Sequence, residues 1–180
     1  IAARTGYTGE EGGEIFIEAP ATPFLWQSLL KVGEKYGVQA IGLGARDTLR
    51  TEMKYSLYGH EIDDTTNPYE AGLGWVIKPT KKDFIGKSVI LAARERGLQQ
   101  GLVGFKMLDK GIPRQGYEVY SGNGEKIGRV TSGTHSPSLD EPIGIAYVTT
   151  PYVAEASEIF VDIRGRKVKA KVCKTPFLSR

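Results

Sequence analysis

The spacing of apolar residues and glycines changes near Gly97, and this change constrains the fold more than any other feature. Before it, apolar residues recur at helical spacing, as at Leu25, Leu29 and Val32. After it, short apolar runs alternate with glycine turns, which is typical of antiparallel sheets. We therefore expect an α+β fold, with an α/β unit over residues 1–97 followed by a small antiparallel β-barrel domain over residues 98–180.

About six strands are expected in the second half. Asn123-Gly124 and Arg164-Gly165 fit the turns of hairpins, because glycine tolerates a positive φ. The expected strands are 102–108, 117–120, 126–132, 143–148, 158–163 and 168–174. A helix of three or more turns within residues 115–175 would contradict the barrel.

Helices are expected in the first half. Thr22 and Pro23 fit the start of one helix and Gly37 fits its end. The stretch 55–74 is mostly irregular, and loops of this length are usually functional or disordered. The other expected elements are a strand over residues 14–18, a short buried strand over 38–41, a helix beginning near Gly42 and a helix over about 86–96.

A glycine-rich stretch lies almost at the start of the chain, Arg4-Thr-Gly-Tyr-Thr-Gly-Glu-Glu-Gly-Gly-Glu14. Four of these residues are glycines, so tight turns are possible. Such a turn holds Tyr7 near Glu14, and an aromatic plate beside a carboxylate suits a flat heterocycle with N–H donors. The alternative interpretation is a solvated hairpin with an ordinary tyrosine and glutamate.

Two arginines, Arg46 and Arg50, are four residues apart and share one helix face. Arg46 falls in the first helical turn, where free N–H groups and a cation can meet an acceptor. Surface ion pairs with Asp47 and Glu52 are the alternative. Trp75 is either a core residue, the default for tryptophan, or a stacking surface at the edge of a pocket.

No metal site is expected, because His60 has no second histidine or cysteine nearby. His135 is interpreted as an ordinary turn histidine. Cys173 is the only cysteine, so no internal disulfide is possible and a reducing compartment is expected. The sequence contains no nucleophile elbow, phosphate loop or dinucleotide fingerprint.

The charge is mildly uneven along the chain. Residues 98–180 hold 12 basic and 8 acidic side chains, within a total net charge of +3. The basic residues are scattered among turns, so we expect no nucleic-acid partner. No apolar run is long enough for a membrane helix, and we expect no membrane partner. Because Ile1 falls inside a turn motif, we also expect the chain to be a fragment.

Five stretches resemble the glycine cleavage system T protein family of aminomethyltransferases. Three are similar to the family's central motifs: Arg4 to Ile15, Leu43-Gly-Ala-Arg-Asp-Thr-Leu-Arg50, and Leu57-Tyr-Gly-His-Glu-Ile-Asp63. Gly128-Arg-Val-Thr-Ser-Gly-Thr-His-Ser-Pro137 and Lys174-Thr-Pro-Phe177 resemble its C-terminal domain. The resemblance runs in order through the chain and covers about the second half of the family's usual length.

The resemblance implies an activity and a binding site. The family transfers the aminomethyl group carried on the lipoyl arm of H protein to tetrahydrofolate, giving 5,10-methylenetetrahydrofolate and ammonia. Tyr7 and Glu14 match pterin-binding positions, Arg46 matches a folate-contacting arginine, and Trp75 matches a tryptophan of the same cavity. The chemistry is consistent, because a carboxylate accepts hydrogen bonds from a pterin N–H edge and aromatic faces stack on its ring.

The resemblance also implies what this chain lacks. The family's catalytic aspartate belongs to its N-terminal half, so no catalytic residue is assigned here and the chain alone is expected to be inactive. Residues 178–180, Leu-Ser-Arg, differ from the tyrosine-bearing tails of some members.

Two alternatives compete with this function. One is the folate-binding C-terminal module of a sarcosine or dimethylglycine dehydrogenase, which is a flavoenzyme. The other is a non-enzymatic folate-binding relative, but those carry a Lys-Gly-Cys-Tyr type motif and nothing like it surrounds Cys173. The expected location is the cytoplasm, or the mitochondrial matrix in a eukaryote.

Overall fold

The computed structural model describes residues 1–179, and these form two compact units, residues 1–50 and residues 51–179. Arg180, the last residue of the tail noted above, lies outside the described residues. The expected division into domains near residue 97 concerns the longer protein and stays a prediction.

The unit of residues 1–50 begins with a small hairpin. Strand β1 (Ala2–Ala3) pairs antiparallel with β2 (Glu14–Ile15), and the glycine-rich stretch connects them. Gly9 in this connection has a φ of 76°, which a residue with a side chain rarely adopts. The backbones of Ile1 and Phe16 also exchange hydrogen bonds of 2.8 Å in both directions. The expected strand is therefore present, but it is shorter than residues 14–18.

Helix α1 (Thr22–Gly33) carries proline in its first turn, as expected, and continues as the 3-10 helix η2 (Glu34–Tyr36). Gly37 ends it in the left-handed region, with a φ of 73°. The next residue folds back, and the Val38 N–H donates to the Gly33 carbonyl at 3.1 Å.

The expectation of a buried strand over residues 38–41 was wrong. No strand forms there, and the side chains of Val38 and Ile41 are 48% and 65% exposed. Val38 instead packs against the α-carbon of Gly33, so closely that a side chain at position 33 would clash with it. A hydrophobic contact after the helix end thus accounts for an apolar residue that the pattern assigned to a sheet. Helix α2 (Leu43–Glu52) follows.

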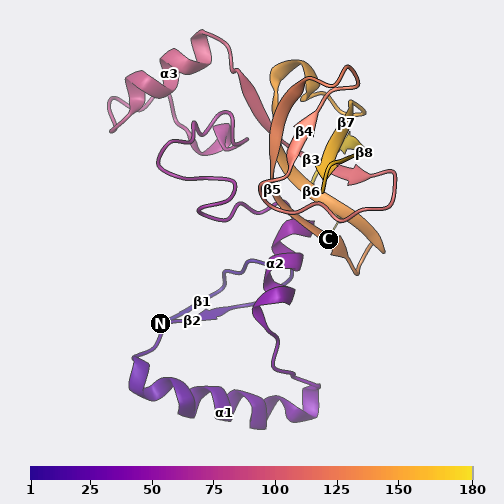
Figure 1. Cartoon of the computed structure of the whole chain (residues 1–180). Helices are drawn as coiled ribbons and strands as arrows, with labels where there is room; N and C mark the ends of the chain where they lie inside the picture. Colours follow the sequence, from indigo (N-terminus) through magenta and orange to yellow (C-terminus); the bar gives the residue numbers. More distant parts are fainter. Residues whose placement is uncertain (180) are drawn as a thin grey trace. The chain divides into compact units, whose positions relative to one another are not determined.

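A closed antiparallel barrel dominates the unit of residues 51–179 (Figure 1). Its strands lie in the order β3-β6-β5-β4-β7-β8, and β3 pairs with both β6 and β8. The strands are β3 (Gln100–Met107), β4 (Glu118–Tyr120), β5 (Lys126–Ser136), β6 (Glu141–Thr149), β7 (Glu158–Ile163) and β8 (Arg166–Cys173). The expected barrel is confirmed, and within residues 115–175 the only helix is the short 3-10 helix η4 (Thr150–Tyr152).

The barrel core is made of aliphatic side chains around Phe105. Alternate residues of each strand point inward, as the period of a strand requires. The buried cluster consists of Val103, Phe105, Met107, Val119, Ile127, Val130, Ala146, Val148, Ile159, Val161, Ile163, Val168, Ala170 and Val172. Strand β5 has an irregular register between Val130 and Ser132, and runs four residues beyond its expected end. His135 consequently lies in β5, next to the turn, with its Nε2 3.7 Å from the Asp140 carboxylate.

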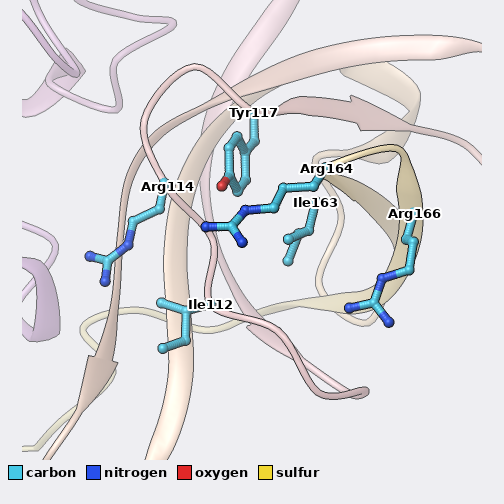
Figure 2. Close-up of a pocket in the computed structure, with 6 residues that line it drawn as sticks. All are labelled: Ile112, Arg114, Tyr117, Ile163, Arg164 and Arg166. Atoms are coloured by element: carbon cyan, nitrogen blue, oxygen red, sulfur yellow. The ribbon is translucent and has the colours of Figure 1, made fainter.

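Both expected hairpin turns are present. Gly124, with a φ of 81°, lies in the connection of β4 to β5. Arg164 and Gly165, with φ values of 55° and 83°, connect β7 to β8 (Figure 2). Two successive positive φ values are the signature of the hairpin turn whose twist matches that of the strands.

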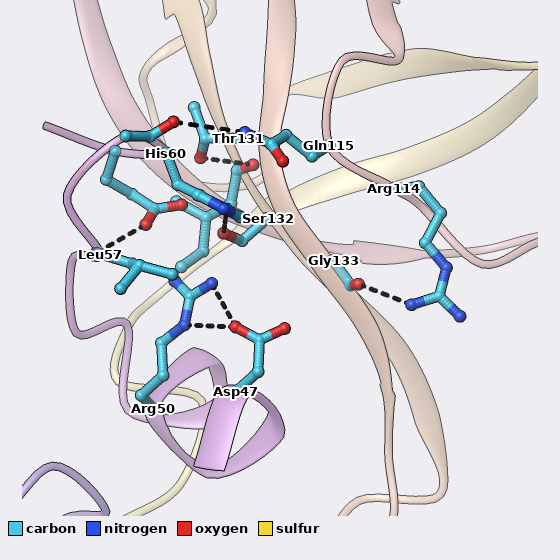
Figure 3. A network of polar contacts seen from close by, with 12 residues as sticks. Asp47, Arg50, Leu57, His60, Arg114, Gln115, Thr131, Ser132 and Gly133 are labelled. Atoms are coloured by element: carbon cyan, nitrogen blue, oxygen red, sulfur yellow. Dashed lines mark hydrogen bonds and ion pairs between the residues drawn. The ribbon is translucent and has the colours of Figure 1, made fainter. Parts of the chain in front are cut away.

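Residues 53–73 form an irregular loop that hydrogen bonds attach to the barrel (Figure 3). The Tyr147 hydroxyl of β6 donates to the Glu61 carbonyl at 2.9 Å. His60 Nδ1 lies 3.3 Å from the Ser132 Oγ, and the Gln115 amide donates to the Gly59 carbonyl at 3.3 Å. After the loop come the 3-10 helix η3 (Gly74–Val76) and helix α3 (Lys87–Glu95).

Replacing Gly128 by alanine is expected to destabilise the barrel by about 1–3 kcal/mol, the usual cost of overpacking. A Cβ at this position would lie 2.0 Å from the backbone carbonyl oxygen of Tyr147, and backbone cannot rotate away. Gly122→Ala is the matched control, because the nearest atom to its Cβ would be 3.8 Å away on Phe160. Denaturant unfolding measures both; equal stabilities would contradict the packing described.

Replacing Tyr147 by phenylalanine removes the donor to the Glu61 carbonyl, and we expect a loss of about 0.5–1.5 kcal/mol. Amide hydrogen exchange in residues 57–63 should become faster than in the unchanged chain. Tyr120→Phe is the control, since the Tyr120 hydroxyl bonds Glu118 on the barrel surface at 2.6 Å. Exchange that is unaltered in Tyr147→Phe would show that this bond does not hold the loop.

Candidate functional site

Tyr7 and Arg46, two of the four predicted binding residues, meet within residues 1–50. The Arg46 guanidinium carbon lies 4.7 Å from the centre of the Tyr7 ring. Tyr7 lies in the glycine-rich connection, and Arg46 lies in the first turn of α2. The backbone N–H of Arg46 donates to the Gly42 carbonyl at 3.3 Å. Stacking on a ring holds the planar guanidinium in one orientation while its N–H donors remain usable at its edge.

Glu14 lies at the start of β2 and is half-buried. Its Oε2 accepts a hydrogen bond of 2.5 Å from the Thr5 hydroxyl, on the opposite side of the glycine-rich connection. This bond orients the carboxylate without using all of its acceptor capacity, because an ionised carboxylate has about four lone-pair positions. The hairpin therefore fixes both an aromatic ring and an oriented acceptor.

Arg50 does not share the role of Arg46. Its side chain is buried, and its Nε and Nη2 donate to the Asp47 carboxylate at 2.8 Å and 2.5 Å. The alternative of ion pairing is therefore correct for Arg50 with Asp47. Glu52, the other carboxylate of that alternative, lies away from the surface: it is buried and accepts hydrogen bonds from the Ser136 and Ser138 hydroxyls at 2.5 Å and 3.1 Å.

Trp75, the fourth predicted residue, lies in η3 within the unit of residues 51–179. Its side chain is 75% exposed, so the default expectation of a core tryptophan is wrong. Exposure leaves its aromatic face available for stacking. The convergence of Tyr7, Glu14, Arg46 and Trp75 on one cavity stays a prediction.

A polar hollow of about 470 Å³ lies between the irregular loop and the barrel. Patterns in the sequence did not predict this hollow, although the acidic and hydroxyl side chains of the loop indicated a polar site. Its lining mixes both charges: His60, Glu61, Asp63, Thr65, Thr66, Glu70, Gln100, Lys126, Gly128, Arg129 and Tyr147.

Several groups of this polar hollow are already engaged by the protein. Hydrogen bonds from Thr65 and Thr66 hold the pKa of Asp63 below its usual range. Glu70 accepts from the Gln100 amide at 3.0 Å. Burial raises the pKa of the Tyr147 hydroxyl, which therefore remains a donor at neutral pH. These contacts favour a structural role for the hollow.

Two groups with shifted pKa values, the Cys173 thiol and the Lys54 amine, are not arranged to act as nucleophiles. Burial raises the pKa of the Cys173 thiol to about 11, so little thiolate exists at neutral pH. Burial lowers the pKa of Lys54, but its Nζ donates to the Leu102 carbonyl at 2.8 Å. Within residues 1–179, no three or more His, Cys, Asp or Glu side chains gather in a way that could hold a metal ion. The same residues include no helix with the length and apolar character needed to cross a bilayer.

Comparison with known proteins identifies two regions of the chain. Residues 1–81 match the GCVT N-terminal domain model, and residues 100–178 match the glycine cleavage T-protein C-terminal barrel domain model. An aminomethyltransferase of Bdellovibrio bacteriovorus is 67% identical over 180 residues, which is 100% of this chain and 50% of that protein. An aminomethyltransferase of Phocaeicola vulgatus is 48% identical over 98% of this chain and 49% of its own length.

A solved structure agrees with these sequence relatives. The crystal structure of glycine cleavage system aminomethyltransferase T from Bartonella henselae matches with a TM-score of 0.92 and 34% identity, over 98% of this chain and 49% of that one. The chain thus spans about half the length of the relatives it matches. Two family models in succession and full-chain identity of up to 67% show that the chain belongs to the glycine cleavage T-protein family of aminomethyltransferases.

Proposed function

We propose that this chain is the folate-binding and barrel portion of an aminomethyltransferase of the glycine cleavage system. The observation that carries the proposal is the pair formed by Tyr7 and Arg46 beside a glycine-rich hairpin in a member of this family. The hairpin also orients the Glu14 carboxylate through Thr5. A ring face, a cation and an acceptor are the groups that a pterin with a negatively charged tail requires.

The proposed reaction is a group transfer without oxidation or reduction. The carbon of the aminomethyl group leaves the sulfur of the lipoyl arm of H protein and also loses its amine. It forms new bonds to N5 and N10 of tetrahydrofolate, which gives 5,10-methylenetetrahydrofolate. The two protons from these nitrogens go to the sulfur and the amine, so the other products are the dihydrolipoyl arm and ammonia.

Each predicted residue has one task in this reaction. Glu14 accepts hydrogen bonds from the N–H edge of the pterin, and Arg46 donates to an acceptor on the folate. Tyr7 and Trp75 contribute aromatic faces that stack on the ring system. These residues bind and orient tetrahydrofolate, and correct positioning supplies a large share of the rate in a reaction between two bound partners.

We also propose that residues 1–180 do not catalyse this transfer alone. No acid or base within the described residues is assigned to the chemistry. Large apolar side chains of residues 1–50 are open to solvent, which is unusual for a complete domain. They include Phe24, Val32, Tyr36, Ile41 and Leu43, each more than 60% exposed. The chain spans 50% of its B. bacteriovorus relative. In this proposal an N-terminal half covers this surface and brings the catalytic aspartate.

The proposed partners are lipoylated H protein and tetrahydrofolate, and the proposed location is the bacterial cytoplasm. The relatives named above are bacterial aminomethyltransferases, which supports this location. Their name also favours a transferase over the folate module of a flavoenzyme.

Replacing Arg46 by alanine should weaken tetrahydrofolate binding by about 1.5–3 kcal/mol, the usual worth of a charge-assisted hydrogen bond. The measurement is titration calorimetry on the chain joined to the N-terminal half of the B. bacteriovorus relative. Arg94→Ala is a matched control, because the Arg94 guanidinium also stacks on a tyrosine, with its carbon 5.2 Å from the Tyr69 ring centre. Equal affinities for the two variants would remove Arg46 from the site.

The chain alone should release no ammonia from aminomethyl-loaded H protein in the presence of tetrahydrofolate. Adding the N-terminal half of the B. bacteriovorus relative, as a separate chain or joined to this one, should restore turnover. That half by itself is the control and should also be inactive, because it lacks Glu14 and Arg46. Ammonia release by residues 1–180 alone would place the catalytic group in this chain and contradict the proposal.

A further inference from the structure

A second hollow, of about 340 Å³, opens at one end of the barrel, and three arginines line it. The lining consists of Ile112, Arg114, Tyr117, Ile163, Arg164 and Arg166 (Figure 2). These residues all belong to the unit of residues 51–179, and none of them is among the predicted folate contacts. We refer to them as the arginine hollow.

The fold brings the three arginines together from two connections. Arg114 lies between β3 and β4, whereas Arg164 is in the turn between β7 and β8 and Arg166 begins β8. Figure 2 shows Arg164 extending across the hollow below Tyr117, with Arg114 and Arg166 on opposite sides. Ile112 and Ile163 supply apolar surface beside the Arg164 guanidinium.

No Asp or Glu of the part of the chain that the structure describes, residues 1–179, lines the arginine hollow. Five acidic side chains of the barrel region pair instead with lysines or with His135: Glu118, Asp140, Glu141, Glu158 and Asp162. Asp162, two residues from Arg164, accepts from the Gly165 N–H at 2.7 Å and from Lys167 at 2.9 Å. Arg114 donates to the Gly133 carbonyl at 3.4 Å, and this acceptor is a neutral group that does not balance the charge of the guanidinium.

Three positive charges around one hollow repel each other, and an anion would remove that repulsion. Guanidinium groups bind carboxylate and phosphate with two parallel hydrogen bonds. A ligand with several anionic groups can place one group on each arginine. The volume is within the range of small-molecule sites, which begins at about 300 Å³.

We propose that the arginine hollow binds a compact polyanion that carries at least two phosphate or carboxylate groups. The anionic groups lie on Arg114, Arg164 and Arg166, and the Tyr117 hydroxyl donates a further hydrogen bond. This binding does not depend on the proposed transferase function. It can therefore be tested without H protein or folate.

The first test is titration calorimetry on residues 1–180 at low salt with inorganic triphosphate, a triglutamate peptide and inorganic monophosphate. One triphosphate or one triglutamate should bind, at least tenfold more tightly than monophosphate, and 0.5 M salt should weaken binding strongly. Comparing the two polyanions distinguishes phosphate from carboxylate chemistry. If neither polyanion binds more tightly than monophosphate, the proposal is overturned.

The second test locates the binding. The double variant Arg164→Gln/Arg166→Gln should bind the polyanion at least tenfold more weakly, while Arg96→Gln should change affinity less than twofold. Arg96 is a suitable control because it is exposed at the end of α3. On the unchanged chain, NMR amide shifts on titration should be confined to residues 112–117 and 163–166. Unaltered affinity in the double variant, or shifts centred elsewhere, would refute the proposed location.

Discussion

The pairing of β3 with both β6 and β8 is the constraint on which the larger unit depends. It closes six strands into a barrel and leaves no open edge on which another chain could pair. Closure also encloses one aliphatic core around Phe105, which is completely buried. On the outside of this rigid frame, Tyr147 and Ser132 hold the loop that precedes the barrel, and the strand connections carry the arginine hollow.

Arginines of this chain differ in burial, and their contacts differ accordingly. Arg50 is buried and must have a partner, which Asp47 provides. Arg46, one helical turn earlier, stacks on Tyr7 and keeps donors for a ligand. The arginines of the barrel hollow are exposed, and its lining within residues 1–179 includes no Asp or Glu, which is the basis of the proposed anion site. Three environments thus give one residue type a structural role, a proposed substrate contact and a proposed anion site.

The exposed apolar surface of residues 1–50 connects the structure to the proposed function. Helix α1 buries no residue except Gly33, although its pattern is that of an amphipathic helix. Exposing this apolar face to water is unfavourable, and in the proposed function a further part of the protein covers it. In the proposed function, the same part completes the folate cavity and supplies the catalytic aspartate, so stability and activity depend on one interface.

Patterns in the sequence were sufficient to predict the barrel strands, both hairpin turns and the three helices, and its motifs were sufficient to indicate the family. The strands, turns and helices follow from local rules, because glycine at positive φ and alternating apolar residues act within a few positions of the chain. The family followed from the resemblance of five motifs. Only the tertiary structure decided that Val38 packs on Gly33 rather than in a sheet, and that Trp75 is exposed. The three-dimensional structure also showed that Arg50 pairs with Asp47 and that Arg46 stacks on Tyr7. It alone placed Arg114 beside Arg164, fifty residues later in the chain. Such choices depend on burial and on contacts between distant segments, which no local pattern in the sequence encodes.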